Sequence, residues 1–338
     1  MATRYIDKVP NLSTIVNRPD AAGIGMYNGG LYANLSGTPF LIAANPAGKV
    51  YYVDANSGDD TDDGRSWEDA FSTMSKALTS VASGDTVYFR GKVREQLTAP
   101  SQVFDVTIIG AGNRPRHSDS TPANGELAAN TWTTPASGAT TAALLKVQQQ
   151  GWRFVNILFA GPTDHACVQL NRSSDSGNDE KDASHAEFIN CRFASGQDGI
   201  SDTGGCFNVL VTGCTFQALT GTAILGVGNI GIGQLKWQIV DNHFTGFTNG
   251  VNITAHECVI QGNFFTDGGT PNTTIVLDLA NTGTGANNFV VGNFFQTTTA
   301  NFNTPDVVGN ATDVWAVNAS IDSTSAGVGG NFEWGQPA

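Results

Sequence analysis

A six-residue phrase recurs between residues 154 and 295 of this chain. The phrase begins with an apolar residue, has Asn, Gly or Asp at its third position, and ends with Phe. Its six copies occupy residues 154–159, 188–193, 211–216, 239–244, 260–265 and 290–295. A unit repeated at intervals of roughly 20–50 residues indicates a solenoid, a propeller or a related array.

The interior of the phrase favours a parallel β-helix among these architectures. Its apolar residue lies in a short β-prone run, and the Gly, Asn or Asp that follows tolerates the left-handed backbone of a sharp corner. Each phrase would form one corner of a coil, with successive coils about 4.8 Å apart. Crossovers between parallel strands favour a right-handed coil. The terminal phenylalanines should then stack in one column, and they are Phe159, Phe193, Phe216, Phe244, Phe265 and Phe295.

A second apolar series follows the phrases and gives each coil at least one more inward face. It lies seven to ten residues after each of the first five phenylalanines, at 167–168, 200, 223–225, 251–253 and 275–277. Spacings between successive phenylalanines vary from 21 residues (244 to 265) to 34 residues (159 to 193). Strands that keep register while the turns between them vary in length explain this irregularity.

The segment before the repeats should contain two small units. Residues 1–48 carry four prolines and no phrase, and Asn28-Gly29-Gly30 predicts a hairpin within a small β-meander at 25–43. Such a meander needs a partner surface, so residues 1–48 are interpreted as an attachment and oligomerisation segment. In residues 49–90, apolar positions at helical spacing predict a helix over 70–81 that caps the first coil and its strand edge. The β-helix should occupy 91–320, and 321–338 should form a C-terminal tail.

Composition and charge exclude several classes of function. The 338 residues carry a formal net charge of −13, which opposes nucleic-acid binding. No run approaches 18 apolar residues, so no membrane insertion is expected. The five cysteines, at 167, 191, 206, 214 and 258, include no CxxC pair and fit reduced core thiols better than a zinc site or a disulfide framework. With no apolar signal core at the start, the chain is expected to fold in a reducing cytoplasm.

Two stretches carry a resemblance to known families. The run Tyr52-Val-Asp-Ala-Asn-Ser-Gly-Asp-Asp, the helix after it, Gly84-Asp-Thr-Val-Tyr-Phe and the recurring Gly-Asn-Phe-Phe resemble right-handed parallel β-helix proteins of the pectate-lyase-like superfamily. Residues 21–43 resemble the short N-terminal attachment modules of bacteriophage tail spikes, tail fibres and related virion-surface proteins. This second resemblance implies a homotrimer on the surface of a virion, docked to another virion protein through residues 1–48.

Residues with catalytic chemistry are sparse. Hydrolases of the superfamily carry Asn-Thr-Asp, Asp-Asp and Gly-His-Gly on neighbouring coils; the first and third are missing here, and the lone Asp59-Asp60 lies in the entry loop. The nearest candidates for a hydrolytic carboxylate pair are Asp198 and Asp202, with Asp164 and His165 one coil earlier, although Asp198-Gly199 is also a simple turn. Carboxylates at Asp59, Asp60, Asp62 and Asp63 offer calcium ligands or a solvated turn. No cofactor and no firm metal site are predicted.

Two hypotheses for function follow. The first is a non-enzymatic phage structural protein, a tail spike or fibre or a capsid-decorating spike, that displays a trimeric β-helix whose outward loops contact host glycans. The second is a tail-spike depolymerase, a hydrolase or lyase that cleaves capsular or lipopolysaccharide glycans. A bacterial surface adhesin is a third idea, which the lack of a signal core opposes.

Overall fold

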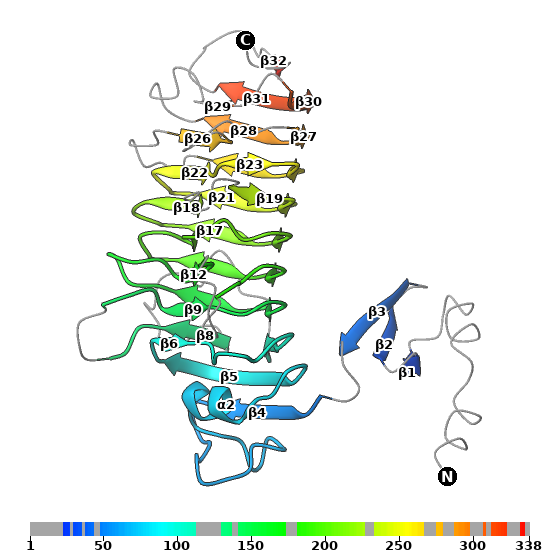
Figure 1. Ribbon diagram of the computed structural model, residues 1–338, viewed down its shortest axis with the longest axis vertical. Helices are drawn as coiled ribbons and strands as arrows, with labels where there is room; N and C mark the ends of the chain where they lie inside the picture. The colour runs from blue at the N-terminus through cyan, green and yellow to red at the C-terminus, as the bar shows by residue number, and fades with distance from the viewer. Residues whose placement is uncertain are drawn as a thin grey trace.

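The computed structural model describes most of the region that carries the repeats. Described are residues 23–27, 30–35, 38–43, 48–112, 130–136, 141–173, 181–226, 233–266, 275–279, 287–297, 307–308, 312–322 and 332–334. From residue 48 onward the strands stack as successive turns of one coil, from β4 at the bottom of Figure 1 to β31 near its top.

Three parallel faces make up the coil, one more than the minimum of two expected from the sequence. The first face contains β4 (Val50–Asp54), β5 (Thr86–Arg94), β7 (Thr107–Gly110), β10 (Arg153–Val155), β13 (Glu187–Ile189), β16 (Leu210–Thr212), β20 (Gln238–Val240), β24 (Val259–Gln261), β27 (Phe289–Val291) and β30 (Val314–Ala316). The second face continues from the end of β5 through β8 (Asn130–Thr133), β11 (Leu158–Ala160), β14 (Arg192–Ala194), β17 (Thr215–Gln217), β21 (His243–Thr245), β25 (Phe264–Thr266), β28 (Phe294–Thr297) and β31 (Asn318–Asp322), where β32 (Phe332–Trp334) pairs antiparallel.

The third face closes each turn of the coil. It contains β6 (Leu97–Thr98), β9 (Leu145–Val147), β12 (Val168–Leu170), β15 (Ile200–Asp202), β18 (Thr222–Gly226), β22 (Asn249–Asn252), β26 (Ile275–Asp278) and β29 (Val307–Val308). A short parallel pair, β19 (Gln234–Leu235) and β23 (Ala255–His256), lies at the corner before the first face. All pairings within the three faces are parallel except that of β32, so the predicted parallel β-helix is confirmed, and the arrangement fits a right-handed coil.

The corner between the first and second faces is the bend that the phrase predicts. Asn156, Asn190 and Asp241 have φ between 53° and 60°, and the glycines in the same slot of the other phrases, 213, 262 and 292, have φ between 62° and 65°. A seventh corner has Val317 at φ 55°, with 73% of its surface exposed. Because Val is β-branched, this backbone is strained there, and the sequence pattern gave no sign of the corner.

The predicted phenylalanine column is also confirmed. Along Phe159, Phe193, Phe216, Phe244, Phe265 and Phe295, successive ring centroids are 4.5–5.4 Å apart and the rings lie within 5–13° of parallel. All six are at most 2% exposed. Trp132 extends the column downward, with its ring centroid 6.0 Å from that of Phe159. The column thus fills the core behind the second face.

A ladder of buried asparagines runs beside this column. The Oδ1 atom of Asn263 accepts hydrogen bonds from the backbone N–H and the side-chain amide of Asn242, both at 3.0 Å, while its own Nδ2 donates to Ile239. Asn293 and Asn318 repeat the arrangement on the next two rungs. Each side chain therefore pairs buried polar groups of the rung below and keeps the rungs in register.

The lower end of the coil is capped, with a shorter helix than predicted. Helix α2 (Met74–Ser80) packs against β4 and buries Met74, Ala77 and Leu78. The predicted start at 70 is wrong because Phe71 forms a bridge with Val53, and Thr73 is the N-cap. In the part of the chain that the structure describes, no helix is long and apolar enough to cross a membrane.

The predicted meander forms in the N-terminal segment. Strands β1 (Gly23–Tyr27), β2 (Gly30–Leu35) and β3 (Thr38–Ala43) pair antiparallel, and Tyr27 at the end of β1 pairs with Gly30 at the start of β2. Residues 1–22 lie outside the described residues, as do most of the residues after 322 and most of residues 113–138. The attachment role of 1–48 stays a prediction.

We expect Phe244→Ala to lower the free energy of unfolding by about 3–5 kcal/mol, because it leaves a cavity between two stacked rings. Phe264→Ala is the matched control, since Phe264 is only half-buried and points outward on the same face. Its loss should be clearly smaller. Chemical denaturation of the two variants measures both values, and equal losses would contradict the column as the main packing element.

Candidate functional site

A polar groove lies on the outward surface of the third face. Lys146, Gln169 and Ser201 occupy equivalent positions on β9, β12 and β15, each paired with the next in register. Their strand neighbours are buried in the core, so alternation directs these three side chains outward. Three neighbouring rungs thus present an ammonium group, an amide and a hydroxyl group in one column.

The turns that precede β12 and β15 form the side of this groove. They contribute His165, Gln197 and Asp198, while Thr141 and the alanines at 142, 143 and 166 complete a hollow of about 300 Å³. The loop hydrogen bond from the N–H of Cys167 to the carbonyl of Asp198, 2.8 Å, ties the two turns together. Side chains from two successive turns therefore line the same groove.

Asp198 contributes a buried carboxyl group to this groove. Its Oδ1 accepts a 2.7 Å hydrogen bond from the N–H of Thr222, and the residue is only 9% exposed. Burial raises the pKa of the Asp198 carboxyl, and the hydrogen bond from Thr222 opposes the rise only in part. A carboxyl with a raised pKa is better able to hold a proton at neutral pH, as a general acid must.

The structure separates the four catalytic candidates. His165 and Asp198 line the groove, and Asp164 lies beside His165, with 3.8 Å between its Oδ2 and the imidazole Nε2. Asp202 is buried inside the coil, where it accepts hydrogen bonds from the N–H groups of residues 204, 205 and 206 and from the amide of Gln234. Burial raises the pKa of Asp202, but its hydrogen bonds stabilise the turn and give it a structural role.

Sequence reasoning missed Lys146, Gln169 and Ser201. The signal was available in principle: each stands one position from an inward apolar residue of the third face. Without the register between β9, β12 and β15, however, nothing in the sequence places the three residues together.

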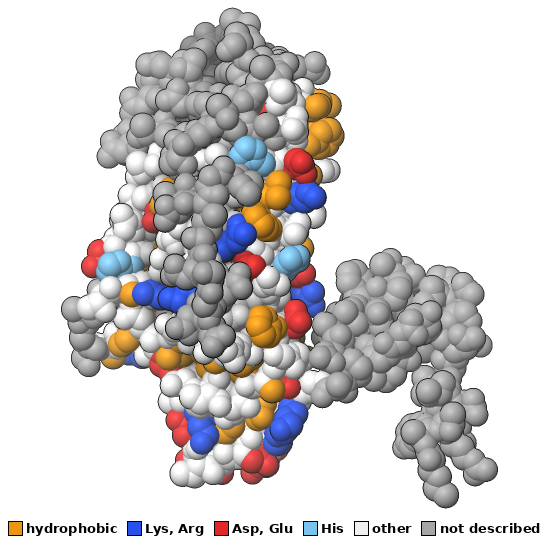
Figure 2. Space-filling model, viewed as in Figure 1, with side chains coloured by type: hydrophobic (Ala, Val, Ile, Leu, Met, Phe, Trp, Pro, Cys, Tyr) orange, Lys and Arg blue, Asp and Glu red, His pale blue; other side chains and the backbone are white. Residues whose placement is uncertain are grey.

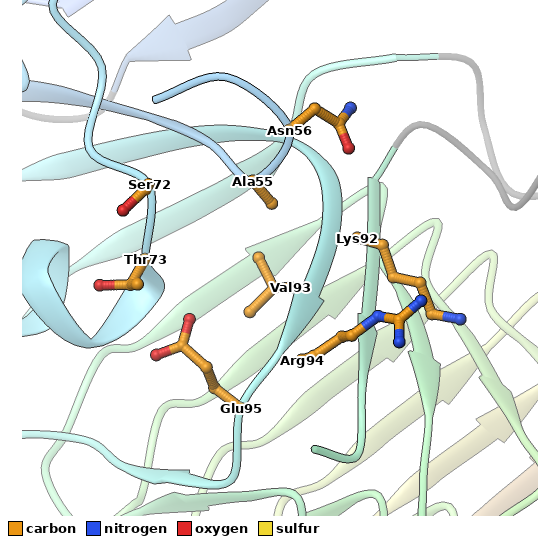
Figure 3. Close-up of a pocket in the computed structure, with 8 residues that line it drawn as sticks. All are labelled: Ala55, Asn56, Ser72, Thr73, Lys92, Val93, Arg94 and Glu95. Carbon is orange, nitrogen blue, oxygen red and sulfur yellow. The ribbon is translucent and has the colours of Figure 1, made fainter. Parts of the chain in front are cut away.

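A second hollow, of about 500 Å³, lies near the lower cap (Figure 3). Lys92 and Arg94 alternate with the buried Val93 at the end of β5, and Glu95 points toward the start of α2. The Glu95 carboxylate accepts hydrogen bonds from the N–H groups of Met74 and Ser75, at 2.7 and 2.9 Å. Burial raises the pKa of Glu95, yet both of its oxygens are bound to the helix start. The carboxylate in this hollow therefore stabilises the start of the capping helix.

Three of the four calcium candidates accept hydrogen bonds from nearby protein groups. Asp59 accepts from the N–H and hydroxyl groups of Thr61, Asp60 from Ser72 and Thr73, and Asp63 from the N–H of Arg65. The hydrogen bonds from Thr61 lower the pKa of Asp59. Burial raises the pKa of Asp60, but the hydrogen bonds from Thr73 and Ser72 together outweigh burial, so the pKa is lowered. Within the described ranges, no three His, Cys, Asp or Glu side chains, Asp62 included, gather where they would hold a metal ion.

The cysteines belong to the core. All five are buried and none forms a disulfide, as predicted for core thiols. Burial raises the pKa of both Cys167 and Cys258 to about 12, so neither thiol is a nucleophile at neutral pH.

No family model matches the sequence, and no curated protein matches it either. Among solved structures, the chain is similar to the GH136 lacto-N-biosidase from Eubacterium ramulus, with a TM-score of 0.54 and 14% identity over 80% of this chain and 56% of that one. It is also similar to the alginate lyase from Paenibacillus sp. str. FPU-7 (TM-score 0.47, 14% identity, 80% and 95% coverage) and to the pectate lyase Pel9A (0.43, 13%, 80% and 79%). At these identities the likeness is one of fold.

We expect Asp198→Asn to be more stable than the wild type at pH 7. The Asp198 pKa is raised above 3.8 in the folded state, so its contribution to stability is full below 3.8 and is lost as pH rises through the folded pKa. Asparagine retains the acceptor for the Thr222 N–H and does not ionise. Thermal unfolding between pH 3 and pH 8 should show a difference that shrinks toward low pH; a difference that grows there would contradict the assignment.

Proposed function

We propose that this protein binds a polysaccharide along the third face of its β-helix. The observation that carries the proposal is the outward column of Lys146, Gln169 and Ser201, flanked by His165 and Asp198, in an open groove. Rungs rise by about 4.8 Å, so an extended sugar chain lying along the coil would meet a polar side chain at each step. Amide, hydroxyl and ammonium groups match the hydroxyl-rich surface of a glycan.

The structural comparison is in accordance with this ligand class. The lacto-N-biosidase that shares the fold is named for action on a sugar. This chain spans 56% of the length of that protein. What supports binding in this chain is its own groove.

Cleavage of the bound glycan is the second candidate function, and Asp198 is the observation that favours it. Burial raises the pKa of this carboxyl, which lines the groove beside His165. A hydrolase needs a second carboxylate roughly 5–10 Å away. Asp164 lies beside His165, and Asp202 is held by hydrogen bonds within its own turn. Binding without cleavage therefore remains the first proposal.

A panel of purified capsular and lipopolysaccharide glycans tests both ideas. Calorimetry should detect binding to the wild type, and Lys146→Ala or Gln169→Ala should weaken it about tenfold, as expected for one lost polar contact. Gln102→Ala, at an exposed glutamine in the turn before β7, is the matched control and should bind normally. Unchanged binding by both groove variants would overturn the site.

The same incubations reveal the second function. Release of reducing ends or of unsaturated products by the wild type, lost in Asp198→Asn, would identify a depolymerase. Binding with no product release would leave a glycan-binding protein.

We also propose that residues 1–48 dock this protein on a phage virion as a homotrimer that displays the β-helix. Support comes from the resemblance of residues 21–43 to virion attachment modules and from a meander of three short strands that needs a partner surface. Deletion of residues 1–48 should leave the circular dichroism of the coil intact and abolish incorporation into particles, measured by immunoblot of purified virions. Normal incorporation would contradict the docking role.

A further inference from the structure

The hollow of about 500 Å³ beside the lower cap lies where three segments of the chain meet (Figure 3). Its walls are the turn after β4 (residues 55–56), the two residues before α2 (72–73) and the end of β5 with the residue that follows it (92–95). We call it the cap hollow. A volume of this size is large enough for a small molecule.

The carboxylates near the cap hollow are bound to groups of the cap itself. Both oxygens of Glu95 accept N–H groups at the start of α2. The hydroxyl of Thr73 donates to Asp60 at 2.7 Å and accepts the N–H of Lys76 at 3.1 Å. Asp60 also accepts the N–H groups of Ser72 and Thr73. These acidic groups therefore stabilise the cap and form no ion pair with the basic side chains of the hollow.

Lys92 and Arg94 supply those basic side chains. Both point outward from the end of β5, on either side of Val93, which is 1% exposed. Figure 3 shows the nitrogen-bearing ends of the two side chains converging, while Glu95 points the other way, toward α2. Burial lowers the pKa of Lys92, and the positive charge of Arg94 lowers it further. The two cations are therefore close enough to repel one another.

Arg94 differs in its contacts from every other arginine that the structure describes. No side-chain hydrogen bond, ion pair or ring contact joins Arg94 or Lys92 to any described residue. On a chain of net charge −13, such a pair gives the hollow a local positive potential. The other described arginines each bind a carboxylate, an amide oxygen or an aromatic ring, and they are Arg65, Arg90, Arg153, Arg172 and Arg192.

Two neutral donors lie in the same hollow. The side-chain amide of Asn56 lies so close to Gly91 that a Cβ atom there would come within 2.9 Å of the amide nitrogen. Because Gly91 precedes Lys92, this contact keeps the amide beside the cationic pair. The hydroxyl of Ser72 has no hydrogen-bond partner among the described residues. Ammonium, guanidinium, amide and hydroxyl groups all donate hydrogen bonds, so the hollow is rich in donors that the described chain does not use.

An oxyanion is the ligand that fits this set of donors. Phosphate and carboxylate oxygens accept hydrogen bonds, and those from Arg and Lys are strong because both partners are charged. A bound anion would also offset the repulsion between the two cations. We propose that the cap hollow binds a small anionic molecule whose phosphate or carboxylate group lies between Lys92 and Arg94.

The cap hollow is separate from the glycan groove. The groove lies on the outward surface of the third face, whereas the hollow lies between the cap and the end of β5 that begins the second face. The inference therefore stands or falls independently of the proposed function.

Calorimetric titration of the full chain with inorganic phosphate near neutral pH tests the site. Phosphate should bind the wild type, and Lys92→Gln and Arg94→Gln should each weaken binding about tenfold or more, as expected for a lost charge-assisted hydrogen bond. Lys49→Gln is the matched control, because it removes the same charge at an exposed position before the opposite end of β4. No binding to the wild type, or equal weakening in all three variants, would overturn the site.

Two further measurements separate a lost site from a damaged fold. Phosphate should raise the midpoint of thermal unfolding of the wild type, and sodium chloride of equal ionic strength should not. Arg94→Lys, which retains the charge, should bind phosphate more tightly than Arg94→Gln. If chloride stabilises the chain as much as phosphate does, the proposal is overturned.

Three ligands with one carbon skeleton identify the anionic group. Glycerol phosphate should bind more tightly than glycerate, because a phosphate monoester carries up to two negative charges against two cations, and glycerol should not bind. Tighter binding of glycerate would identify a carboxylate ligand for the same site. Equal binding of glycerol and glycerol phosphate would show that charge is not recognised and would overturn the proposal.

Discussion

Register between stacked rungs is the constraint on which the rest of this molecule depends. Side chains in a strand alternate between the two surfaces, so a slip by one residue would turn the phenylalanine column outward. The left-handed corner, the stacked rings and the asparagine ladder all act on the same few residues of each rung. Together they fix where every strand begins relative to the strand below it.

Fixed register makes the outward positions as regular as the core. It is the reason that a lysine, a glutamine and a serine, each separated by more than 20 residues of chain, form one polar column on the third face. It is also the reason that Ile109, Val155 and Ile189, on three neighbouring rungs, align along the first face. The regular arrangement of residues on the surface therefore follows from the register that the core fixes.

The turns between strands differ from rung to rung in length and in the side chains that they present. The corner between the first and second faces is a single left-handed residue, whereas the turn after the second face varies in length and supplies His165 and Asp198 to the groove. A solenoid tolerates such variation because the turns lie outside the stacked core. The strands of the rungs form a regular scaffold, and the turns determine which functional groups lie beside it.

Much of the fold could be predicted because the six-residue phrase is recognised from neighbouring residues alone. A bend residue three positions before a buried Phe requires only neighbouring residues to be recognised, and the structure confirms every one of the six copies. Two features escaped the pattern. Val317 forms a corner without a permissive residue, and the helix of the cap begins at Met74 because Phe71 is drawn into a bridge with Val53. In both cases contacts made by the assembled coil override local preference.

The sequence by itself determined the parallel coil, its aromatic column and the burial of its cysteines, because these depend on spacing within a rung. Only the tertiary structure decided which polar residues meet. Asp198 and Asp202 lie four positions apart, yet one lines the groove and the other is held inside by three N–H groups and an amide. Their different locations depend on which residues of neighbouring rungs lie side by side. Because the turns differ in length, the sequence alone does not show this pairing.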